Sequence, residues 1–296
     1  MLIRRLHSKI RSFIESIYRG CKYSYLYMQE KKKFGNFYFP YRKLHEGEEV
    51  YILANGPSLK GEILQLMESR KDLSQSVVVN FFIESELFHR IRPKYYCLAD
   101  PIFNQKSKLT ERTKGVYAKL NNEVTWSMTL FVWKEAEGML RNVINNPNIQ
   151  IVGLSILMFG GFESNRYKYY KKGMAVPSYV NVTIMALYAM LNLGYSTIYL
   201  YGVDHTFLTN LVVGDDNILY VEDCHFYGTE RVIADYHADG TPWRVAEYIY
   251  DKYLTFVEHE VMRGYANYLG AQIINCTKGS WIDAYVRRAQ LEKQSE

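Results

Sequence analysis

One short segment has the residue types and order of a loop that binds an anion. It lies between an apolar run at residues 50–54 and an expected helix over residues 59–69, and its members are Asn55, Gly56, Pro57 and Ser58. Glycine lets the backbone approach a ligand, proline fits the first helical turn, and the N–H groups at a helix N-terminus attract a nucleotide phosphate. The segment matches neither the Walker loop nor the G-x-G-x-x-G fingerprint. A ligand loop and an ordinary capped turn both remain open.

Polar residues also follow three other apolar runs. Asn80 comes after residues 77–79, Asp100 follows Ala99, and Asp204 follows a run that contains Gly202. The carboxyl ends of parallel strands meet at one edge of a sheet, so we expect these residues to line one cleft. An amide or carboxylate there could contact a base or a ribose, or it could only cap its strand. Asp204 could also fix a neighbouring side chain.

The polar segment at residues 204–244 interrupts the regular pattern and holds three of the seven histidines, His205, His225 and His237. Carboxylates near His225 in the sequence EDCHFYG could fix its tautomer and raise its basicity, so it is a candidate general base. We interpret His205 as a structural residue. An insertion of this size is typical of a lid over an active site, and a surface excursion that only caps the core is the alternative.

From Glu49 onward the apolar pattern alternates between strands and helices. Strands are expected at residues 50–54, 77–82, 95–99, 149–153, 197–203 and 271–275, and helices at residues 59–69, 182–193 and 257–269. Residues 174–203 carry no charge, but prolines, polar residues and a change of period favour a buried helix, a turn at Gly194 and a strand over a membrane span. This order predicts an α/β fold, with a mostly parallel sheet covered by helices on both faces.

The composition excludes several classes of protein. The 296 residues are 48% hydrophobic, which excludes disorder and collagen-like repeats. The net charge of +5 comes without a recognisable nucleic-acid-binding motif, so no nucleic-acid partner is expected. The four cysteines show no spacing of a zinc site, and we expect reduced thiols in a cytoplasmic protein without a signal peptide. Tyrosine is abundant at 27 residues, and its apolar ring and polar hydroxyl suit partly solvated clefts as well as cores.

Residues 1–45 differ from the domain expected at residues 46–296, which has its lid at about residues 205–244. Apolar residues recur at helical spacing from Leu2 to Ile17, with basic residues between them. Such a helix can lie on an anionic membrane surface, which would place the protein at the inner face of the cytoplasmic membrane through residues 1–40. It can equally pack on its own domain or on a second subunit of a homo-oligomer.

Taken in order, several of these segments resemble the bacterial sialyltransferases of glycosyltransferase family 42. The matching segments are VYILANGPSLK, VVVNFF, LGYSTIYLYGVD, EDCHFYG and EVMRGYANYLGAQIINCTKGSWIDAYV, within about residues 49–290. The resemblance implies a Rossmann-like domain of a GT-A variant type with a lid. It also implies inverting transfer of an acidic sugar from a CMP donor to a surface glycan or glycolipid, as in lipopolysaccharide or capsule biosynthesis, with no cofactor and no essential metal.

The resemblance also implies roles for individual residues. Asn55, Gly56 and Ser58 look like the nucleotide-phosphate loop, Asn80 like the amide that contacts the cytidine or donor, and His225 like the general base. Asp100 stands at the place of a family asparagine. Thr206 replaces a phosphate-binding tyrosine, Tyr220 is the candidate for the other lid tyrosine, and Tyr227 could compensate. The family's Thr-Ser pair before the buried helix has three candidate replacements, Ser178, Asn181 and Thr183.

Other functions remain open. The GPSL turn and the GVD strand end also resemble the hydroxymethylpterin diphosphokinase-like family and its motility-accessory relatives, which implies ATP-dependent diphosphoryl transfer or transfer of another nonulosonic acid. A different nucleotide-sugar donor is a further alternative. The third is a non-enzymatic module that binds a nucleotide or glycan.

Overall fold

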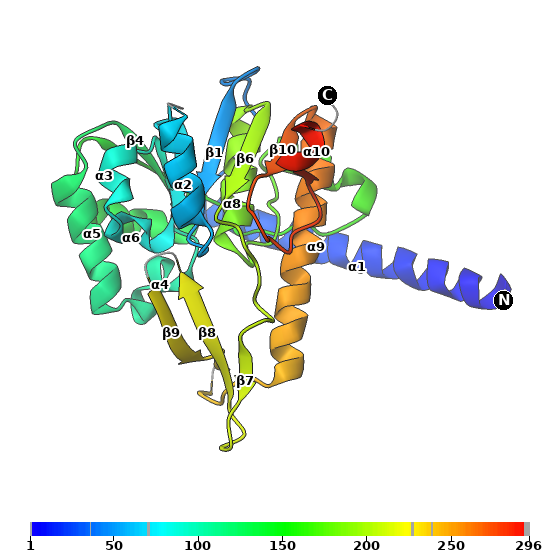
Figure 1. Cartoon of the computed structure of the whole chain (residues 1–296). Helices are drawn as coiled ribbons and strands as arrows, with labels where there is room; N and C mark the ends of the chain where they lie inside the picture. Colours follow the sequence, from blue (N-terminus) through cyan, green and yellow to red (C-terminus); the bar gives the residue numbers. More distant parts are fainter. Residues whose placement is uncertain (1, 36, 70–71, 226–227, 238, 293–296) are drawn as a thin grey trace.

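The computed structural model describes residues 2–35, 37–69, 72–225, 228–237 and 239–292; within these ranges, residues 2–8, 222–225, 228–230 and 292 are described by their backbone alone. Eight parallel strands form the main sheet, in the order β11-β10-β6-β1-β2-β3-β4-β5 (Figure 1). Their bounds are β1 Glu49–Leu53, β2 Ser76–Val79, β3 Tyr95–Cys97, β4 Met128–Trp133, β5 Ile149–Leu154, β6 Thr197–Tyr201, β10 Gln272–Asn275 and β11 Val286–Arg287.

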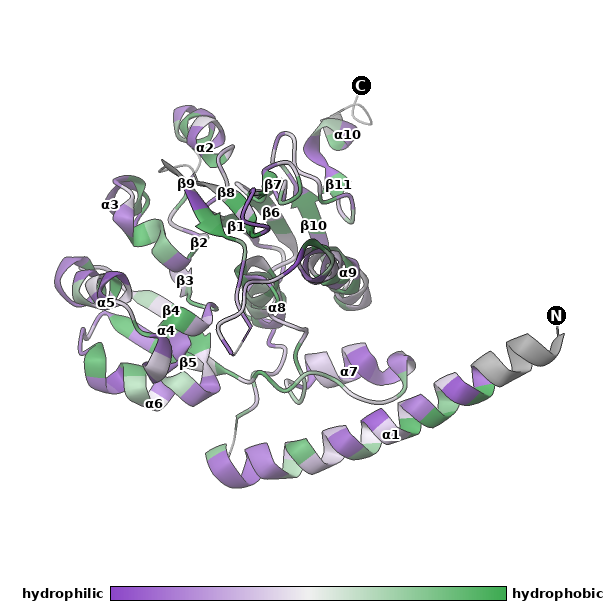
Figure 2. Ribbon diagram, turned by 90° about the horizontal axis from the view of Figure 1, so that it is seen from below, coloured by the Kyte–Doolittle hydropathy of each residue, from purple (hydrophilic) through white to green (hydrophobic). Residues whose placement is uncertain are grey.

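Helices cover both faces of this sheet (Figures 1 and 2). One face packs against α2 Leu59–Glu68, α3 Leu87–Ile91, α5 Glu111–Glu123 and α6 Lys134–Val143. The other packs against α7 Arg166–Lys171, α8 Val182–Leu193 and α9 Val245–Leu269. Shorter elements are α4 Pro101–Asn104, α10 Arg288–Glu292 and the 3₁₀ turns η1 Asn80–Glu84, η2 Lys106–Lys108 and η3 Glu163–Asn165. The predicted α/β fold with a parallel sheet is confirmed.

The uncharged run forms the predicted helix, turn and strand. Helix α8 has the predicted bounds, and 11 of its 12 residues are buried. Gly194 ends it in the left-handed region at φ 96°, and β6 follows as an interior strand of the sheet, between β1 and β10. A helix buried all round must be apolar all round, which explains why this run resembles a membrane span. Among the described helices, none combines the length and apolar character needed to cross a bilayer.

Several elements differ from the predictions: α3, α5, α6, α7 and β11 were not predicted, and β3 and β6 end two residues early. Three further differences are informative. The second strand ends at Val79 because Asn80 turns the backbone to φ 46° and begins η1. Strand β4 was not predicted, although its burial is nearly continuous. Helix α9 begins at Val245, 12 residues before the predicted start, and the early turns carry exposed polar and aromatic residues that weaken the apolar pattern.

A second, three-stranded antiparallel sheet lies within the segment predicted as a lid. It consists of β7 Leu211–Val213, β8 Leu219–His225 and β9 Gly228–Ile233, in the order β7-β8-β9. Figure 1 shows this sheet below the carboxyl edge of the main sheet, beside the first turns of α9. Its position is suitable for covering a ligand held at that edge.

The N-terminal helix α1, Leu2–Phe34, packs on the domain along only part of its length (Figure 2). The buried Tyr23 donates a hydrogen bond to the Met174 carbonyl at 2.8 Å. Farther toward the N-terminus, Ile10, Phe13 and Ile14 expose 47%, 56% and 59% of their surface. The structure therefore shows packing on the domain and also leaves an apolar stretch of α1 uncovered.

Asn192, buried in α8, ties three segments together. Its amide donates to the Phe39 carbonyl at 2.6 Å and to the Tyr170 carbonyl at 3.2 Å, and its oxygen accepts from the Tyr265 hydroxyl. We expect Asn192→Leu to lower the free energy of unfolding by about 2 to 4 kcal/mol, because the Phe39 carbonyl and the Tyr265 hydroxyl lose this buried partner and the Tyr170 carbonyl loses one of its donors. Urea denaturation followed by circular dichroism measures the change. Asn267→Leu, at an exposed position of α9, is the control, and equal stability of the two variants would contradict the prediction.

Candidate active site

A cavity of about 450 Å³ opens at the carboxyl edge of the sheet. Its walls come from the loops after β1, β2, β3 and β6, from the start of α8, from the three-stranded sheet and from α9. The lining includes ten of the predicted residues: Asn55, Gly56, Pro57, Asn80, Asp100, Asn181, Thr183, Gly202, Asp204 and Thr206. The expectation that these strand ends converge on one cleft is confirmed as geometry, and their roles toward a ligand stay predictions.

The turn after β1 packs directly on the end of β6. The Gly56 N–H donates to the Gly202 carbonyl at 2.8 Å, and the Ala54 N–H donates to the Tyr201 carbonyl at 2.9 Å. A Cβ atom on Gly56 would overlap the Asp204 carboxylate and the Gly202 carbonyl. Glycine is therefore required at position 56 by the close approach of two backbone segments, and Gly202 itself lies at φ 66°.

Two partly buried carboxylates, Asp204 and Glu62, accept hydrogen bonds at this junction. Asp204 Oδ2 accepts a hydrogen bond from the Ser58 hydroxyl at 2.9 Å, and burial raises the pKa of Asp204 while the hydrogen bonds from Ser58 lower it. Glu62 accepts from the N–H groups of Gly202 at 3.0 Å and Lys278 at 2.7 Å, and burial raises its pKa. Among the roles considered for Asp204, the observed contact is the one that fixes a neighbouring side chain. Ser58 faces Asp204 and lines a separate cavity behind α2.

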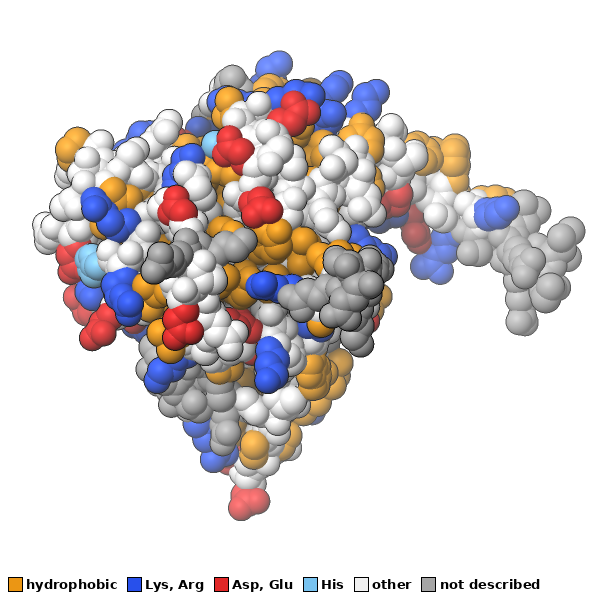
Figure 3. Space-filling model, turned by 45° about the horizontal axis from the view of Figure 1, so that its top comes forward, with side chains coloured by type: hydrophobic (Ala, Val, Ile, Leu, Met, Phe, Trp, Pro, Cys, Tyr) orange, Lys and Arg blue, Asp and Glu red, His pale blue; other side chains and the backbone are white. Residues whose placement is uncertain are grey.

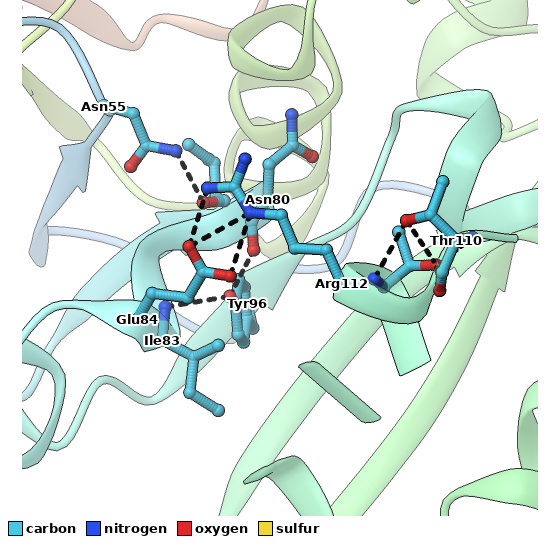
Figure 4. A network of polar contacts seen from close by, with 9 residues as sticks. Asn55, Asn80, Ile83, Glu84, Tyr96, Thr110 and Arg112 are labelled. Atoms are coloured by element: carbon cyan, nitrogen blue, oxygen red, sulfur yellow. Dashed lines mark hydrogen bonds and ion pairs between the residues drawn. The ribbon is translucent and has the colours of Figure 1, made fainter. Parts of the chain in front are cut away.

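Asn55 and Asn80 each present a buried, unsatisfied oxygen at the cavity (Figure 4). Asn55 Nδ2 donates to the Val79 carbonyl at 3.2 Å, which fixes the orientation of its side chain. The Oδ1 atoms of both residues have no hydrogen-bond partner in the described part of the chain. Buried acceptors in this state favour a ligand that brings N–H or O–H donors.

Asp100 has a structural partner. Its Oδ1 accepts from the Ile102 N–H at 3.0 Å and caps α4. Burial raises its pKa, and the nearby Asp235 carboxylate adds to the rise, whereas the Ile102 hydrogen bond and the Lys108 charge oppose it. The cap considered from the sequence is therefore present, on a residue that also lines the cavity.

Near the start of α8, the three candidate donor-binding residues Ser178, Asn181 and Thr183 differ in their position relative to the cavity. Asn181 caps the helix by accepting from the Thr183 N–H at 2.7 Å, and both residues line the cavity. The Ser178 N–H instead donates to Glu258 at 3.3 Å, and Ser178 is not among the described lining residues.

The lid residues are only partly described. Tyr220 donates to Asp216 at 2.7 Å and lies under the Arg231 guanidinium, away from the described cavity wall. Tyr227 lies outside the described residues. His225 ends β8, where its backbone pairs with Gly228, and its side chain lies outside the description. The assignment of His225 as general base stays a prediction.

His205, expected from the sequence to be structural, also lies in the cavity wall. His205 is 8% exposed, its backbone is left-handed at φ 52°, and its Nε2 lies 3.0 Å from Nε2 of His259. Nδ1 of His259 lies 2.9 Å from the Tyr285 hydroxyl. Burial holds the pKa of His205 well below its ordinary range and lowers that of His259 to about 3. Both imidazoles are therefore neutral at physiological pH.

Lys252 and Tyr248 of α9 also line the cavity and were not predicted. The Lys252 ammonium lies 2.8 Å from Asp251 and 5.0 Å from the centre of the Phe207 ring, another lining residue. The i, i+4 spacing of Tyr248 and Lys252 would have identified a shared helix face if α9 had been predicted from Val245. Across the described residues, no group of three His, Cys, Asp or Glu side chains is arranged to hold a metal ion.

Comparisons with known proteins return a distant likeness among solved structures. No protein-family model matches the chain, and no curated protein matches it in sequence. Among solved structures, it is similar to the MAf glycosyltransferase from Magnetospirillum magneticum AMB-1, with 14% identity and a TM-score of 0.49 over 86% of this chain. This chain covers 35% of that protein's length. A likeness at this level carries no argument about activity.

The buried histidine pair predicts a pH-dependent stability. An unfolded chain protonates each histidine near pH 6.5, whereas folded His259 stays neutral down to about pH 3. Between these values the unfolded state binds more protons, so we expect the free energy of unfolding to fall as the pH is lowered from about 6.5 toward 4. Denaturant titrations at several pH values measure the slope.

His259→Gln should reduce that slope, because it removes one of the two depressed groups. His89→Gln is the matched control, since His89 lies at the surface beside Glu123, and it should leave the slope contributed by the buried pair intact. The slope, not the absolute stability, is the readout, so a general loss of stability in the His259 variant does not obscure it. Equal slopes in the wild type and His259→Gln would refute the prediction.

Proposed function

We propose that this protein is an inverting glycosyltransferase that moves an acidic sugar, sialic acid or a related sugar, from a CMP donor to a surface glycan or lipid-linked acceptor. The observation that carries the proposal is the pair of unsatisfied oxygens of Asn55 and Asn80 beside the Gly56 turn, at the carboxyl edge of a parallel sheet. The ordered motifs that resemble glycosyltransferase family 42 support the same reaction class.

The unsatisfied oxygens favour a cytidine donor. Both Oδ1 atoms accept hydrogen bonds, and cytosine offers an exocyclic amine while its ribose offers hydroxyl groups. Uracil has a carbonyl oxygen where cytosine has the amine, so it would place an acceptor against an acceptor. A site of this kind discriminates strongly, because the wrong base leaves a buried polar group unpaired.

The phosphate would lie near Gly56 and Pro57, at the positive end of the α2 helix dipole, which favours an anion. The N–H groups of Gly56 and Leu59 donate to backbone carbonyls and that of Ser58 donates to Asp204, so the attraction would come from the dipole. Lys252 lines the same cavity and adds a positive charge. When CMP departs, negative charge grows on the phosphate while the sugar acquires oxocarbenium character. The helix dipole and a cation can stabilise that charge, and the proposal includes transfer without an essential divalent metal.

The acceptor hydroxyl must lose a proton as it attacks the anomeric carbon from the face opposite the phosphate. We assign this proton to His225 at the end of β8, where Glu222 and Asp223 precede it in the same strand. The nucleophilic oxygen forms the new glycosidic bond, the bond to the phosphate oxygen breaks, and the imidazole takes the proton.

Helix α1 is proposed to hold the enzyme at an anionic membrane, close to a lipid-linked acceptor. Its sequence carries nine Lys and Arg residues against two Glu residues, a larger excess than the net charge of +5 of the whole chain. Figure 3 shows hydrophobic and basic side chains along the helix where it projects from the domain. Exposed apolar groups with a basic flank are typical of helices that lie in a membrane interface. Pairing of this helix with a second copy of the chain is the competing outcome.

The function is tested by thermal shift and turnover with a panel of nucleotides and nucleotide-sugars. We expect CMP and CMP-sugars to raise the melting temperature more than UMP, UDP-sugars or ATP, and we expect transfer to persist in EDTA. His225→Ala should lower turnover by about 10² to 10⁴-fold and leave CMP binding unchanged. His237→Ala, a histidine of the same segment that pairs with Glu247, is the control.

Each of the other possible results would favour a different function or remove one part of the proposal. Stabilisation by ATP with no effect of CMP would favour the diphosphokinase. Preference for a different nucleotide-sugar would keep the reaction class and replace the donor. Binding without turnover across the whole panel would favour a binding module. Unchanged turnover in His225→Ala would remove the base assignment alone.

Membrane attachment is tested by sedimentation with vesicles. We expect the full chain to sediment with phosphatidylglycerol vesicles, to stay in solution with phosphatidylcholine vesicles, and to be released by salt. Combined substitution of Ile10, Ile14 and Ile17 by Gln should abolish sedimentation, because these exposed side chains would enter the interface. Tyr18→Gln, at 69% exposure on the same helix, is the control for a surface change. Full sedimentation of the triple variant, or a monomeric triple variant beside a dimeric wild type, would contradict the proposal.

A further inference from the structure

Three buried titratable side chains form a chain that leads inward from the cavity. His205 lines the cavity, His259 of α9 is fully buried, and Tyr285 is 5% exposed. The two contacts between them measure 3.0 Å, from His205 Nε2 to His259 Nε2, and 2.9 Å, from His259 Nδ1 to the Tyr285 hydroxyl. Polar groups buried in this way are costly unless they satisfy one another, so their hydrogens must follow a consistent order.

The backbone fixes the position of His205. The Val203 N–H donates to the Thr277 hydroxyl at 3.1 Å, and the Trp281 N–H donates to the Asp204 carbonyl at 2.9 Å. The left-handed φ of 52° then turns the ring of His205 toward α9. These contacts hold an unfavourable conformation of a non-glycine residue, which is a common feature of functional sites.

The Tyr285 hydroxyl determines which ring nitrogen carries the hydrogen in His259 and then in His205. Burial keeps Tyr285 protonated by raising its pKa, and in the described part of the chain the acceptor for its hydroxyl is His259 Nδ1. His259 is neutral, so its hydrogen must be on Nε2, where it donates to His205 Nε2. Since His205 is neutral as well, its own hydrogen must be on Nδ1.

Nδ1 of His205 has no hydrogen-bond partner among the side chains and backbone groups that the structure describes, and the residue borders the cavity. The charged and titratable groups that face the ring are His259 and Lys252 of α9, and the positive charge of Lys252 opposes protonation. Asp204, next in the chain, is engaged with Ser58. The side chain therefore offers one N–H group to a ligand and keeps it over a wide range of pH.

We propose that His205 is a neutral N–H donor that binds a phosphate oxygen of the nucleotide substrate, in a tautomer dictated by His259 and Tyr285. The choice of a phosphate rests on the proposed function and on the position of Gly56, Pro57 and Lys252 in the same cavity wall. A general base needs a lone pair where His205 carries a hydrogen, so this residue cannot take the proton of the acceptor. Instead, it stabilises charge on the leaving phosphate without transferring a proton.

The tautomer is tested on the free protein, without any assumption about the reaction. Long-range ¹H–¹⁵N correlation spectra of histidine-labelled protein distinguish the two neutral tautomers, and His205→Gln and His259→Gln assign the signals by their loss. We expect Nδ1–H at His205 and Nε2–H at His259, unchanged between pH 5.5 and 8.5. An Nε2–H tautomer or protonation of His205 within this range would overturn the proposal.

The ligand is tested by calorimetry with CMP and with cytidine, which differ only in the phosphate. His205→Gln should weaken CMP binding by about ten- to hundredfold and leave cytidine binding unchanged, because its amide extends toward His259 and leaves the phosphate unpaired. His205→Asn should retain most of the CMP affinity, since its amide nitrogen can occupy the place of Nδ1 and asparagine tolerates a positive φ. Melting temperatures of both variants control for folding.

The results distinguish a failure of the proposed function from a failure of the donor role of His205. If the wild type binds neither CMP nor cytidine, the proposed function fails, and the spectra still decide the tautomer. If His205→Gln binds CMP as tightly as the wild type does, the donor role of His205 fails, and the proposed function stands. Equal losses of CMP and cytidine affinity in His205→Gln would also overturn the contact with the phosphate.

Discussion

The contact between the turn after β1 and the end of β6 is the constraint on which the site depends. Two backbone segments, about 150 residues apart in sequence, approach so closely that Gly56 has no room for a side chain, and the turn after β1 donates two backbone hydrogen bonds to carbonyls at the end of β6. The Asp204 carboxylate lies against this junction and is held by Ser58. Because the loops after β2 and β3 end at the same edge, fixing this junction also fixes the cavity and the direction in which its polar groups point.

The buried polar groups of the domain fall into two sets that have different physical meanings. Asp204, Glu62 and Asn192 have their hydrogen-bonding capacity used by neighbouring groups, so they stabilise the fold. The Oδ1 atoms of Asn55 and Asn80 lie buried without partners in the described chain, although the Val79 carbonyl holds the amide nitrogen of Asn55. A folded protein rarely leaves buried acceptors unsatisfied, and the simplest account is a ligand that supplies the donors.

Helix α9 couples the core to the site. Its carboxyl half places Met262, Tyr265 and Ala266 in the apolar core, whereas its first turns bring Tyr248 and Lys252 to the cavity. Between these two regions it carries His259, which sets the hydrogen of His205. One rigid helix therefore fixes both a cation and an N–H donor at the same wall, and packing in the core determines their positions.

The sequence alone determined the elements whose signals are local. The bounds of α8, the left-handed glycine that ends it and the polar residues after β1, β2 and β6 follow from apolar runs, φ preferences and strand ends, which neighbouring residues decide. Only the tertiary structure decided which residues meet. Ser58 is hydrogen-bonded to Asp204, 146 residues away in sequence, and His205 contacts His259, 54 residues away. No local sequence pattern could therefore reveal these pairs. The tautomer of His205 depends on Tyr285, a residue that never touches the cavity, because buried hydrogen bonds must be satisfied in three dimensions.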